Sequence, residues 1–227
     1  MYTITDIYNY YHIMPTLRQH QLRVAAVGVY IARHSTHDVS ETDIATALLL
    51  HDMGNIIKFD FRIFPDFCNP EGAPYWERIQ RAFRLRYGHN EHHAHLEIAR
   101  ELGMPEHIIH YIDAVGFSMM NDTHTSDSFE QKICAYADQR VGPFGVISLK
   151  ERLHEGRIRY NITEEEARYD LVESVLAIEH DIFSAMDVSP DAISDEAIAD
   201  IMRELEDFVI EDVSVADIHT IKFDISD

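Results

Sequence analysis

An apolar run that ends in a histidine and a carboxylate places the strongest constraint on how this chain can fold. Leu48 to Leu50 are followed directly by His51 and Asp52, and Gly54 comes two residues later. The apolar spacing before the pair predicts a helix with His51 on its inner face, at its C-terminal end. Burying an imidazole and a carboxylate is unfavourable unless hydrogen bonds or an opposite charge compensate. We therefore expect the fold to bring partners for this pair from elsewhere in the chain.

The remainder of the sequence reads as helices separated by glycines, prolines and capping residues. Apolar residues three and four positions apart predict helices at residues 15–34, 40–51, 74–85, 90–102, 105–115, 128–141, 149–153, 163–186 and 194–209. Residues 55–74 and 121–127 are expected to be loops, whereas 213–225 fits an edge strand, a docked tail or disorder. We predict an all-α fold, with one domain at residues 1–145 and a C-terminal helical extension at 146–227 that packs on it.

Two further polar residues fall on the apolar faces of predicted helices. They are His20, in the helix at residues 15–34, and Asp138, in the helix at residues 128–141. Together with His51 and Asp52 they form a set of two imidazoles and two carboxylates from three helices. Such a mixed nitrogen and oxygen set suits one divalent transition metal ion, namely Mn, Fe, Co, Ni or Zn. The alternative is a helical core in which hydrogen bonds satisfy all four groups.

The order of these residues resembles the HD-domain superfamily of metal-dependent phosphohydrolases. The resemblance covers roughly residues 15 to 145 and is carried by the stretches LRQHQLRVA at 17–25, LLLHDMG at 48–54 and AYAD at 135–138. It implies a helical bundle in which the metal ligands are His20, His51, Asp52 and Asp138.

Many members of this superfamily hold a second metal ion through additional histidines between the His-Asp pair and the final aspartate. His92, at the start of its predicted helix, fits the first of these positions, with His95 as runner-up. Residues 114–117, where the second position is expected, contain no histidine. One metal site is therefore expected, and the sequence does not decide whether there is a second.

The resemblance implies that a small phosphorylated molecule is hydrolysed by water, and a nucleotide is the favoured substrate. Asp52 is expected to orient the water, whereas Arg18 and Lys58 are the candidates for holding the phosphate, with Arg23 and Arg140 as further candidates. Two alternatives are a non-haem di-iron oxygenase of the HD type and a non-catalytic sensor that binds a metal or a nucleotide.

The charge and composition restrict the partners. The 227 residues include 40 acidic and 19 basic side chains, a formal net charge of −21 that disfavours binding to extended nucleic acid. No apolar run approaches the roughly 18 residues that cross a bilayer, and the first residues do not resemble a secretory signal. Two cysteines indicate a reducing compartment, so we expect a cytoplasmic protein without a membrane partner. The sequence does not decide the oligomeric state, and a homodimer is one alternative.

Overall fold

The computed structural model describes residues 2–159, 161–163, 167–184 and 186–210, and these residues form an all-α fold, as predicted. The α-helices are α1 (Ile4–Tyr10), α2 (Pro15–His34), α3 (Glu41–Leu50), α4 (Ala73–Tyr87), α5 (Glu91–Glu101), α6 (Glu106–Ala114), α7 (Met120–Thr125), α8 (Phe129–Asp138), α9 (Leu149–Arg159), α10 (Tyr169–Phe183) and α11 (Asp195–Glu206). Short 3-10 helices are η1 (Asn55–Lys58), η2 (Pro65–Cys68), η3 (Phe117–Met119) and η4 (Pro190–Ala192).

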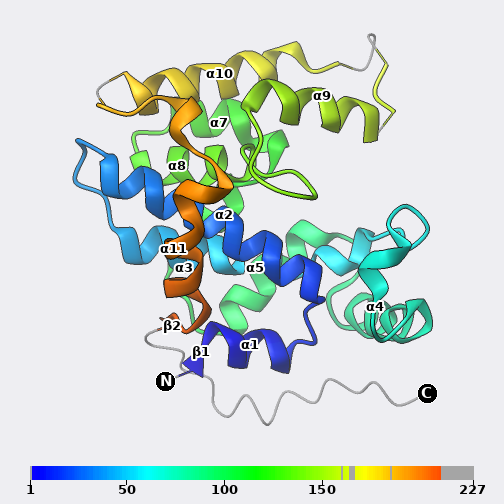
Figure 1. Cartoon of the computed structure of the whole chain (residues 1–227). Helices are drawn as coiled ribbons and strands as arrows, with labels where there is room; N and C mark the ends of the chain where they lie inside the picture. Colours follow the sequence, from blue (N-terminus) through cyan, green and yellow to red (C-terminus); the bar gives the residue numbers. More distant parts are fainter. Residues whose placement is uncertain (1, 160, 164–166, 185, 211–227) are drawn as a thin grey trace.

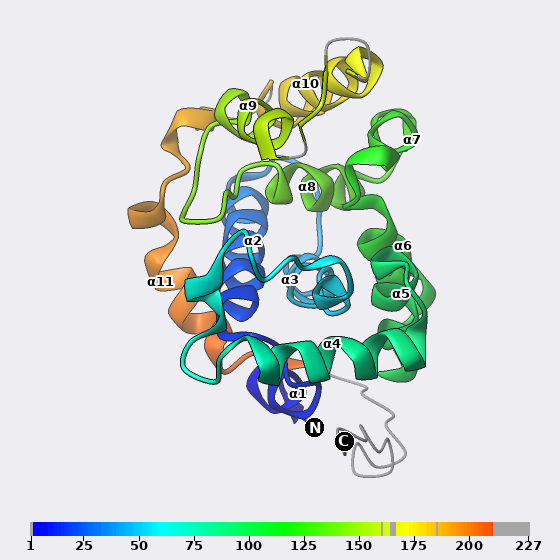
Figure 2. The same ribbon diagram turned by 90° about the vertical axis from the view of Figure 1, so that its right-hand side faces the viewer.

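Helices α2 and α3 form the centre of the molecule. Figure 2 shows them surrounded by α11 on one side, α5 and α6 on the other, α4 below and α8 above. The two central helices pack closely because α2 has a glycine at the contact: a Cβ atom on Gly28 would lie 2.3 Å from Cδ1 of Leu48 and 3.0 Å from Cγ2 of Ile44. Ser40 begins α3 as predicted, since its hydroxyl accepts a hydrogen bond from the Asp43 amide at 3.2 Å.

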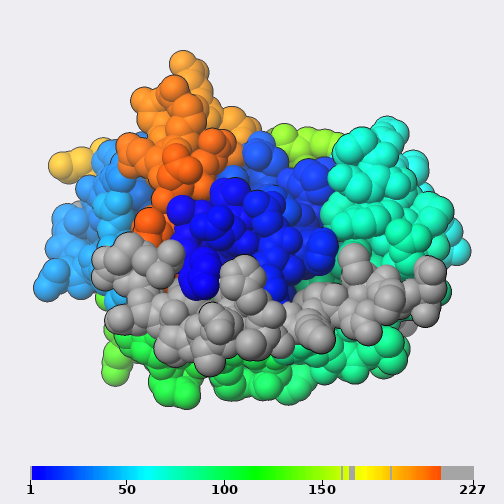
Figure 3. All heavy atoms as spheres, turned by 90° about the horizontal axis from the view of Figure 1, so that it is seen from below, coloured from blue at the N-terminus to red at the C-terminus, as the bar shows by residue number. Residues whose placement is uncertain are grey.

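The two ends of the described chain meet at one edge of the fold. Strand β1 (Tyr2–Thr3) pairs antiparallel with β2 (Val209–Ile210), next to α1 and α11 (Figure 1). Seen from below, the dark-blue N-terminal segment lies between the orange C-terminal helix and the cyan and turquoise region that includes α4 (Figure 3). Helix α11 also packs along α2, where the Arg23 guanidinium lies 2.8 Å from the Asp195 carboxylate.

The segment between α3 and α4 contains more regular structure than expected for a loop. It forms η1 and η2, and side chains of α4 hold it in place. The amide of Gln80 donates to the carbonyl oxygens of Ile56 and Phe59, and the Arg84 guanidinium donates to that of Ile57. These long-range hydrogen bonds have no signature in the local sequence.

Other boundaries also differ from the prediction. Residues 121–127 were expected to be a loop, but most of them belong to α7, which packs on α10 through hydrogen bonds from Asn121 to Asp170 and from Ser174 to Asn121. Helix α9 continues to Arg159, six residues beyond its predicted end, and α1 was not predicted at all. Residues 164–166, at the start of the helix predicted at 163–186, and the strand or tail expected at 213–225 lie outside the described residues, and α10 begins at Tyr169. None of the described helices combines the length and the apolar character needed to cross a membrane.

Candidate metal centre

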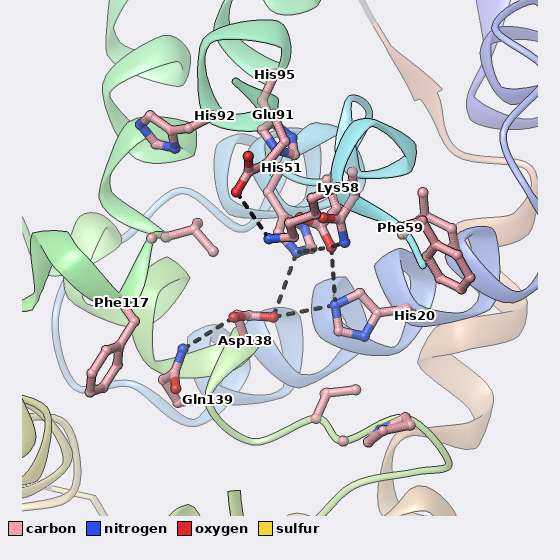
Figure 4. Close-up of a pocket in the computed structure, with 18 of the residues that line it drawn as sticks. His20, His51, Lys58, Phe59, Glu91, His92, His95, Phe117, Asp138 and Gln139 are labelled. Carbon is pink, nitrogen blue, oxygen red and sulfur yellow. Dashed lines mark hydrogen bonds and ion pairs between the residues drawn. The ribbon is translucent and has the colours of Figure 1, made fainter. Parts of the chain in front are cut away.

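Three helices bring together the four residues expected to bind metal. His20 belongs to α2, His51 and Asp52 follow the last turn of α3, and Asp138 is the last residue of α8. The His20 Nε2 atom lies 3.5 Å from Asp52 Oδ2 and 3.3 Å from Asp138 Oδ1. The His51 Nε2 atom lies 3.9 and 3.7 Å from the same two oxygens. Figure 4 shows His20 and Asp138 turned toward each other below His51.

The ring of His51 is held in an orientation that suits a metal ligand. Its Nδ1 atom lies 2.6 Å from the backbone carbonyl oxygen of Leu48, an acceptor, so Nδ1 carries the proton. The opposite atom, Nε2, is buried and has no hydrogen-bond partner. With an ion bound, the imidazole would be neutral in this tautomer and its Nε2 lone pair would face the ion beside the carboxylates, which is the arrangement found for metal-binding histidines. The residues present therefore fit a divalent ion.

Neighbouring amides orient both carboxylates. Asn55 donates from Nδ2 to Asp52 Oδ2 at 2.8 Å, and Gln139 donates from Nε2 to Asp138 Oδ2 at 3.1 Å. The second contact leaves Oδ1 of Asp138 facing the two imidazoles. Gln21 accepts a hydrogen bond from the Asp52 backbone amide at 3.3 Å. Sequence reasoning missed Gln21 and Gln139, although each stands directly beside a predicted ligand.

The four groups perturb one another's protonation. Burial alone would lower the pKa of His51, but the charges of Asp52 and Asp138 outweigh it and raise that pKa to about 9. Burial alone would raise the pKa of both carboxyl groups, but the imidazoles outweigh it, so the pKa of Asp52 is lowered and that of Asp138 falls well below its usual value. The carboxylates thus attract positive charge at this position.

The spacing agrees with a shared ion for three of the four residues. Ligand atoms of His20, His51 and Asp52 all lie within 4.8 Å of one another, and Asp138 is not a member of this set. Its Oδ1 atom nevertheless lies within 3.7 Å of both imidazoles.

The histidines of α5 lie close to this cluster because a turn and a helix approach each other at Gly54. A Cβ atom on Gly54 would lie 2.6 Å from Cβ of Ala94. His92, the candidate for a second metal, lies with Nε2 2.6 Å from Asp113 Oδ1, while His95 is buried and its burial lowers its pKa to about 3. In Figure 4 both histidines lie on the far side of His51 from Asp138.

The cluster lies in the wall of a cavity of about 360 Å³, a volume within the range of small-molecule sites. Lys58 also lines this cavity, where its amino group lies 3.3 Å from the Glu91 carboxylate (Figure 4). Apolar lining comes from the rings of Phe59, Phe64, Phe67 and Phe117. The cavity therefore combines polar side chains, at the candidate metal ligands, with aromatic surface.

Arg18 does not line the cavity, contrary to expectation. Its guanidinium is turned toward α1, where it donates to Ile13 O at 2.7 Å, Asn9 Oδ1 at 2.7 Å and Tyr8 O at 3.1 Å. The reason is that residues on a helix only two positions apart, such as 18 and 20, point in different directions. We therefore withdraw Arg18 as a phosphate ligand.

The two further arginine candidates are also engaged elsewhere. Arg23 binds Asp195, and Arg140 is buried with hydrogen bonds to Ile147 O and the Tyr136 hydroxyl. The guanidinium groups that do line the cavity are those of Arg152 and Arg159 in α9. Sequence reasoning missed them, but their spacing of seven positions, which places both on one helical face, was a usable signal.

The donor set therefore fits a divalent cation, and it lies at the wall of a cavity whose volume is in the range of small-molecule sites. Comparison of the chain with protein-family models, with curated proteins and with solved structures found no match.

Proposed function

We propose that the chain is a metal-dependent phosphohydrolase that acts on a small phosphorylated molecule, with a nucleotide as the favoured substrate. The observation that carries the proposal is the buried, unpartnered Nε2 atom of His51, which lies within 4 Å of carboxylate oxygens of Asp52 and Asp138. A buried polar atom without a partner is costly, so it points to a ligand that completes the site. When bound, a divalent ion would lower the pKa of a water molecule and neutralise charge on a phosphate.

The residues of the chain have separate tasks in this proposal. His20, His51, Asp52 and Asp138 would hold the ion, and the amide of Asn55 would keep Asp52 oriented. In hydrolysis the water oxygen forms a new bond to phosphorus and the bond to the leaving oxygen breaks. For a phosphomonoester, the leaving oxygen takes up one proton of the water, and the other proton stays on the released phosphate.

Two features of the cavity support a nucleotide as substrate. Lys58 places a cationic group in the wall that also carries the metal ligands, which favours a phosphate there. The four phenylalanine rings offer apolar surface on which a planar base can stack. The di-iron oxygenase requires about six ligands around two ions, and no observation favours it, since His92 is already held by Asp113.

The first experiment measures metal content after purification without chelators. Wild type is expected to retain about one transition-metal ion per chain, whereas His51→Gln and Asp138→Asn lose it. His93→Gln is the matched control, because His93 is exposed at the start of α5 and does not line the cavity. Equal metal content in wild type and both site variants, with circular dichroism showing folded protein, would disprove the site.

The second experiment measures phosphate release from nucleoside monophosphates, nucleoside triphosphates, cyclic dinucleotides and generic phosphate esters in the presence of Mn, Co, Ni or Mg. Turnover by wild type and its loss in Asp52→Asn support the hydrolase. Metal-loaded protein that shows no turnover across the panel would instead favour the non-catalytic sensor.

A further inference from the structure

The turn at residues 141–146 links a candidate metal ligand to the wall of the cavity. It follows α8, whose last residue is Asp138, and two residues of the turn, Gly142 and Pro143, line the cavity. The amide of Gly142 donates to the carbonyl oxygen of Gly145 at 2.9 Å, which closes the turn. Because the turn begins three residues after Asp138, its position bears on where that carboxylate lies.

The same turn also contributes to the aromatic surface next to the cavity. The ring of Phe144 meets the rings of Phe64 and Phe67 edge-on, and the ring centroids are 6.0 Å apart in both pairs. Phe64 and Phe67 line the cavity and are stacked on each other with centroids 4.8 Å apart. Since the Phe144 side chain stays 77% exposed, burial of its ring contributes little to holding the turn in place.

Asp195, the first residue of α11, holds the turn although it does not line the cavity. Its Oδ2 atom accepts a hydrogen bond from the Val146 amide at 2.9 Å, and its Oδ1 atom accepts one from Nε of Arg23 at 2.8 Å. Arg23 belongs to α2, three residues after His20. One carboxylate thus joins the turn after Asp138 to the helix that carries His20, and these two candidate ligands lie 3.3 Å apart, from Nε2 to Oδ1.

The backbone around this carboxylate leaves room for it only because residue 145 is a glycine. A Cβ atom on Gly145 would lie 2.5 Å from Asp195 Oδ2, closer than real Cβ contacts, so a side chain there would displace the carboxylate. Arg140, directly before the turn, is buried, and its guanidinium donates to Ile147 O at 2.8 Å and to Pro190 O at 3.0 Å. The segment that leads into α11 therefore contacts both the start and the end of the turn.

We propose that Asp195 is a positioning residue, which holds the turn at 141–146 against α2 and thereby fixes Asp138 opposite His20. This inference rests on the proposed function, and it gives the C-terminal helix α11 a task in the metal site. The carboxylate would touch neither the ion nor the substrate, since it acts only through the turn. Hydrogen bonds to an ionised carboxylate are stronger than those between neutral groups, which suits it to this task.

The test compares Asp195→Ala with Glu204→Ala in the full chain. Glu204 also joins α11 to α2, through the Arg33 guanidinium at 2.7 Å, but neither residue of that pair lines the cavity. Hydrogen–deuterium exchange of the protein in EDTA should be faster at residues 141–147 in Asp195→Ala and unchanged there in Glu204→Ala. Competition with a chromophoric chelator should show Mn²⁺ affinity weakened by about 10-fold in Asp195→Ala, at the lower end of the range for groups that orient metal ligands, and wild-type affinity in Glu204→Ala.

A second variant acts on the same carboxylate from the other side. Gly145→Ala displaces Asp195 and should therefore give the same two changes, in exchange and in Mn²⁺ affinity. The double variant with Asp195→Ala should show no further loss of affinity, because the contact is already broken. Additive losses in the double variant would mean that the two residues act independently, which contradicts the proposal.

Two outcomes would overturn the role of Asp195: equal exchange at residues 141–147 in wild type and Asp195→Ala, or faster exchange with unchanged Mn²⁺ affinity. Circular dichroism shows whether each variant is folded, and Asp195→Asn, which keeps one acceptor oxygen, serves if the alanine variant is not. The inference and the proposed function can fail separately. Wild type that binds no metal overturns the function and the link to the metal site, while faster exchange in Asp195→Ala would still establish that this carboxylate holds the turn.

Discussion

At the scale of single residues, hydrogen bonds around the proposed ligands are expected to set the affinity of the site for metal. The amide of Asn55 donates to Asp52 Oδ2 at 2.8 Å and fixes the direction of that carboxylate. We expect Asn55→Ala to weaken metal affinity by about 10- to 100-fold without unfolding the protein. Competition with a chromophoric chelator measures this change. Gln19→Ala, at an exposed amide next to His20, should leave the affinity unchanged, and an equal loss in both variants would contradict the assignment.

His95 should make the stability of the metal-free protein sensitive to acid. Its burial lowers the pKa from 6.5 to about 3 in the folded state, so the unfolded chain binds the extra proton between these values. The contribution of neutral His95 is fully present above pH 6.5 and is lost as pH falls toward 3. Between pH 6.5 and 4.5 the loss is about 2–3 kcal/mol. Urea unfolding in EDTA at the two pH values should show a smaller difference for His95→Gln, and an unchanged difference would refute this prediction.

Helical periodicity identified three of the four metal-binding candidates, and Asp52 was added as the neighbour of His51, but the groups around them were not identified. The inward direction of His20, His51 and Asp138 follows from the apolar residues on the same helical faces. Periodicity gives the helical face of a long cationic side chain, but not where its charged end finally lies. Arg18 bends toward backbone carbonyls of the N-terminal segment, which local sequence does not reveal. Arg152 lies beyond the stretch that resembles a known family, so the resemblance does not indicate it.

At the scale of elements, one close approach positions α5 against the turn after α3. A Cβ atom on Gly54 would lie 2.6 Å from Cβ of Ala94 and 3.0 Å from the Glu91 carbonyl oxygen, and neither neighbour can move without moving α5. We expect Gly54→Ala to destabilise the fold by about 1–3 kcal/mol, as overpacking does. Denaturant unfolding measures the change. Gly116→Ala is the control, because its new atom would meet neighbours only at 3.8 Å, and equal stability of Gly54→Ala and wild type would contradict the packing argument.

Elements with a strong apolar period were predictable, and those formed by tertiary contacts were not. The long central helix begins at Pro15 and ends at His34, as the sequence indicated. Helix α7 buries only Met120 and Thr123, too few apolar positions to show a period, and its contacts with α10 stabilise it instead. The segment before α4 is similar, because donors on Gln80 and Arg84 hold it from a distance.

At the scale of the whole molecule, the proposed metal site forms only when the chain is folded. Its ligands come from α2, the end of α3 and the end of α8, which are far apart in the sequence and meet in the centre of the fold. The unfolded chain offers the same groups without their arrangement. A divalent ion should therefore bind the folded state much more tightly and stabilise the entire molecule.

This coupling predicts the effect of metal on thermal unfolding. At a free Mn²⁺ concentration of about 100 times Kd, one site adds about 2.7 kcal/mol to the free energy of unfolding. For a chain of this size that corresponds to a rise in Tm of about 5–10 °C relative to protein in EDTA, which scanning calorimetry measures. His20→Ala should abolish the rise, since the imidazole between Asp52 and Asp138 is then missing, whereas His93→Gln should retain it. A rise of equal size in both variants would mean that Mn²⁺ binds elsewhere, because His93 is exposed and does not line the cavity.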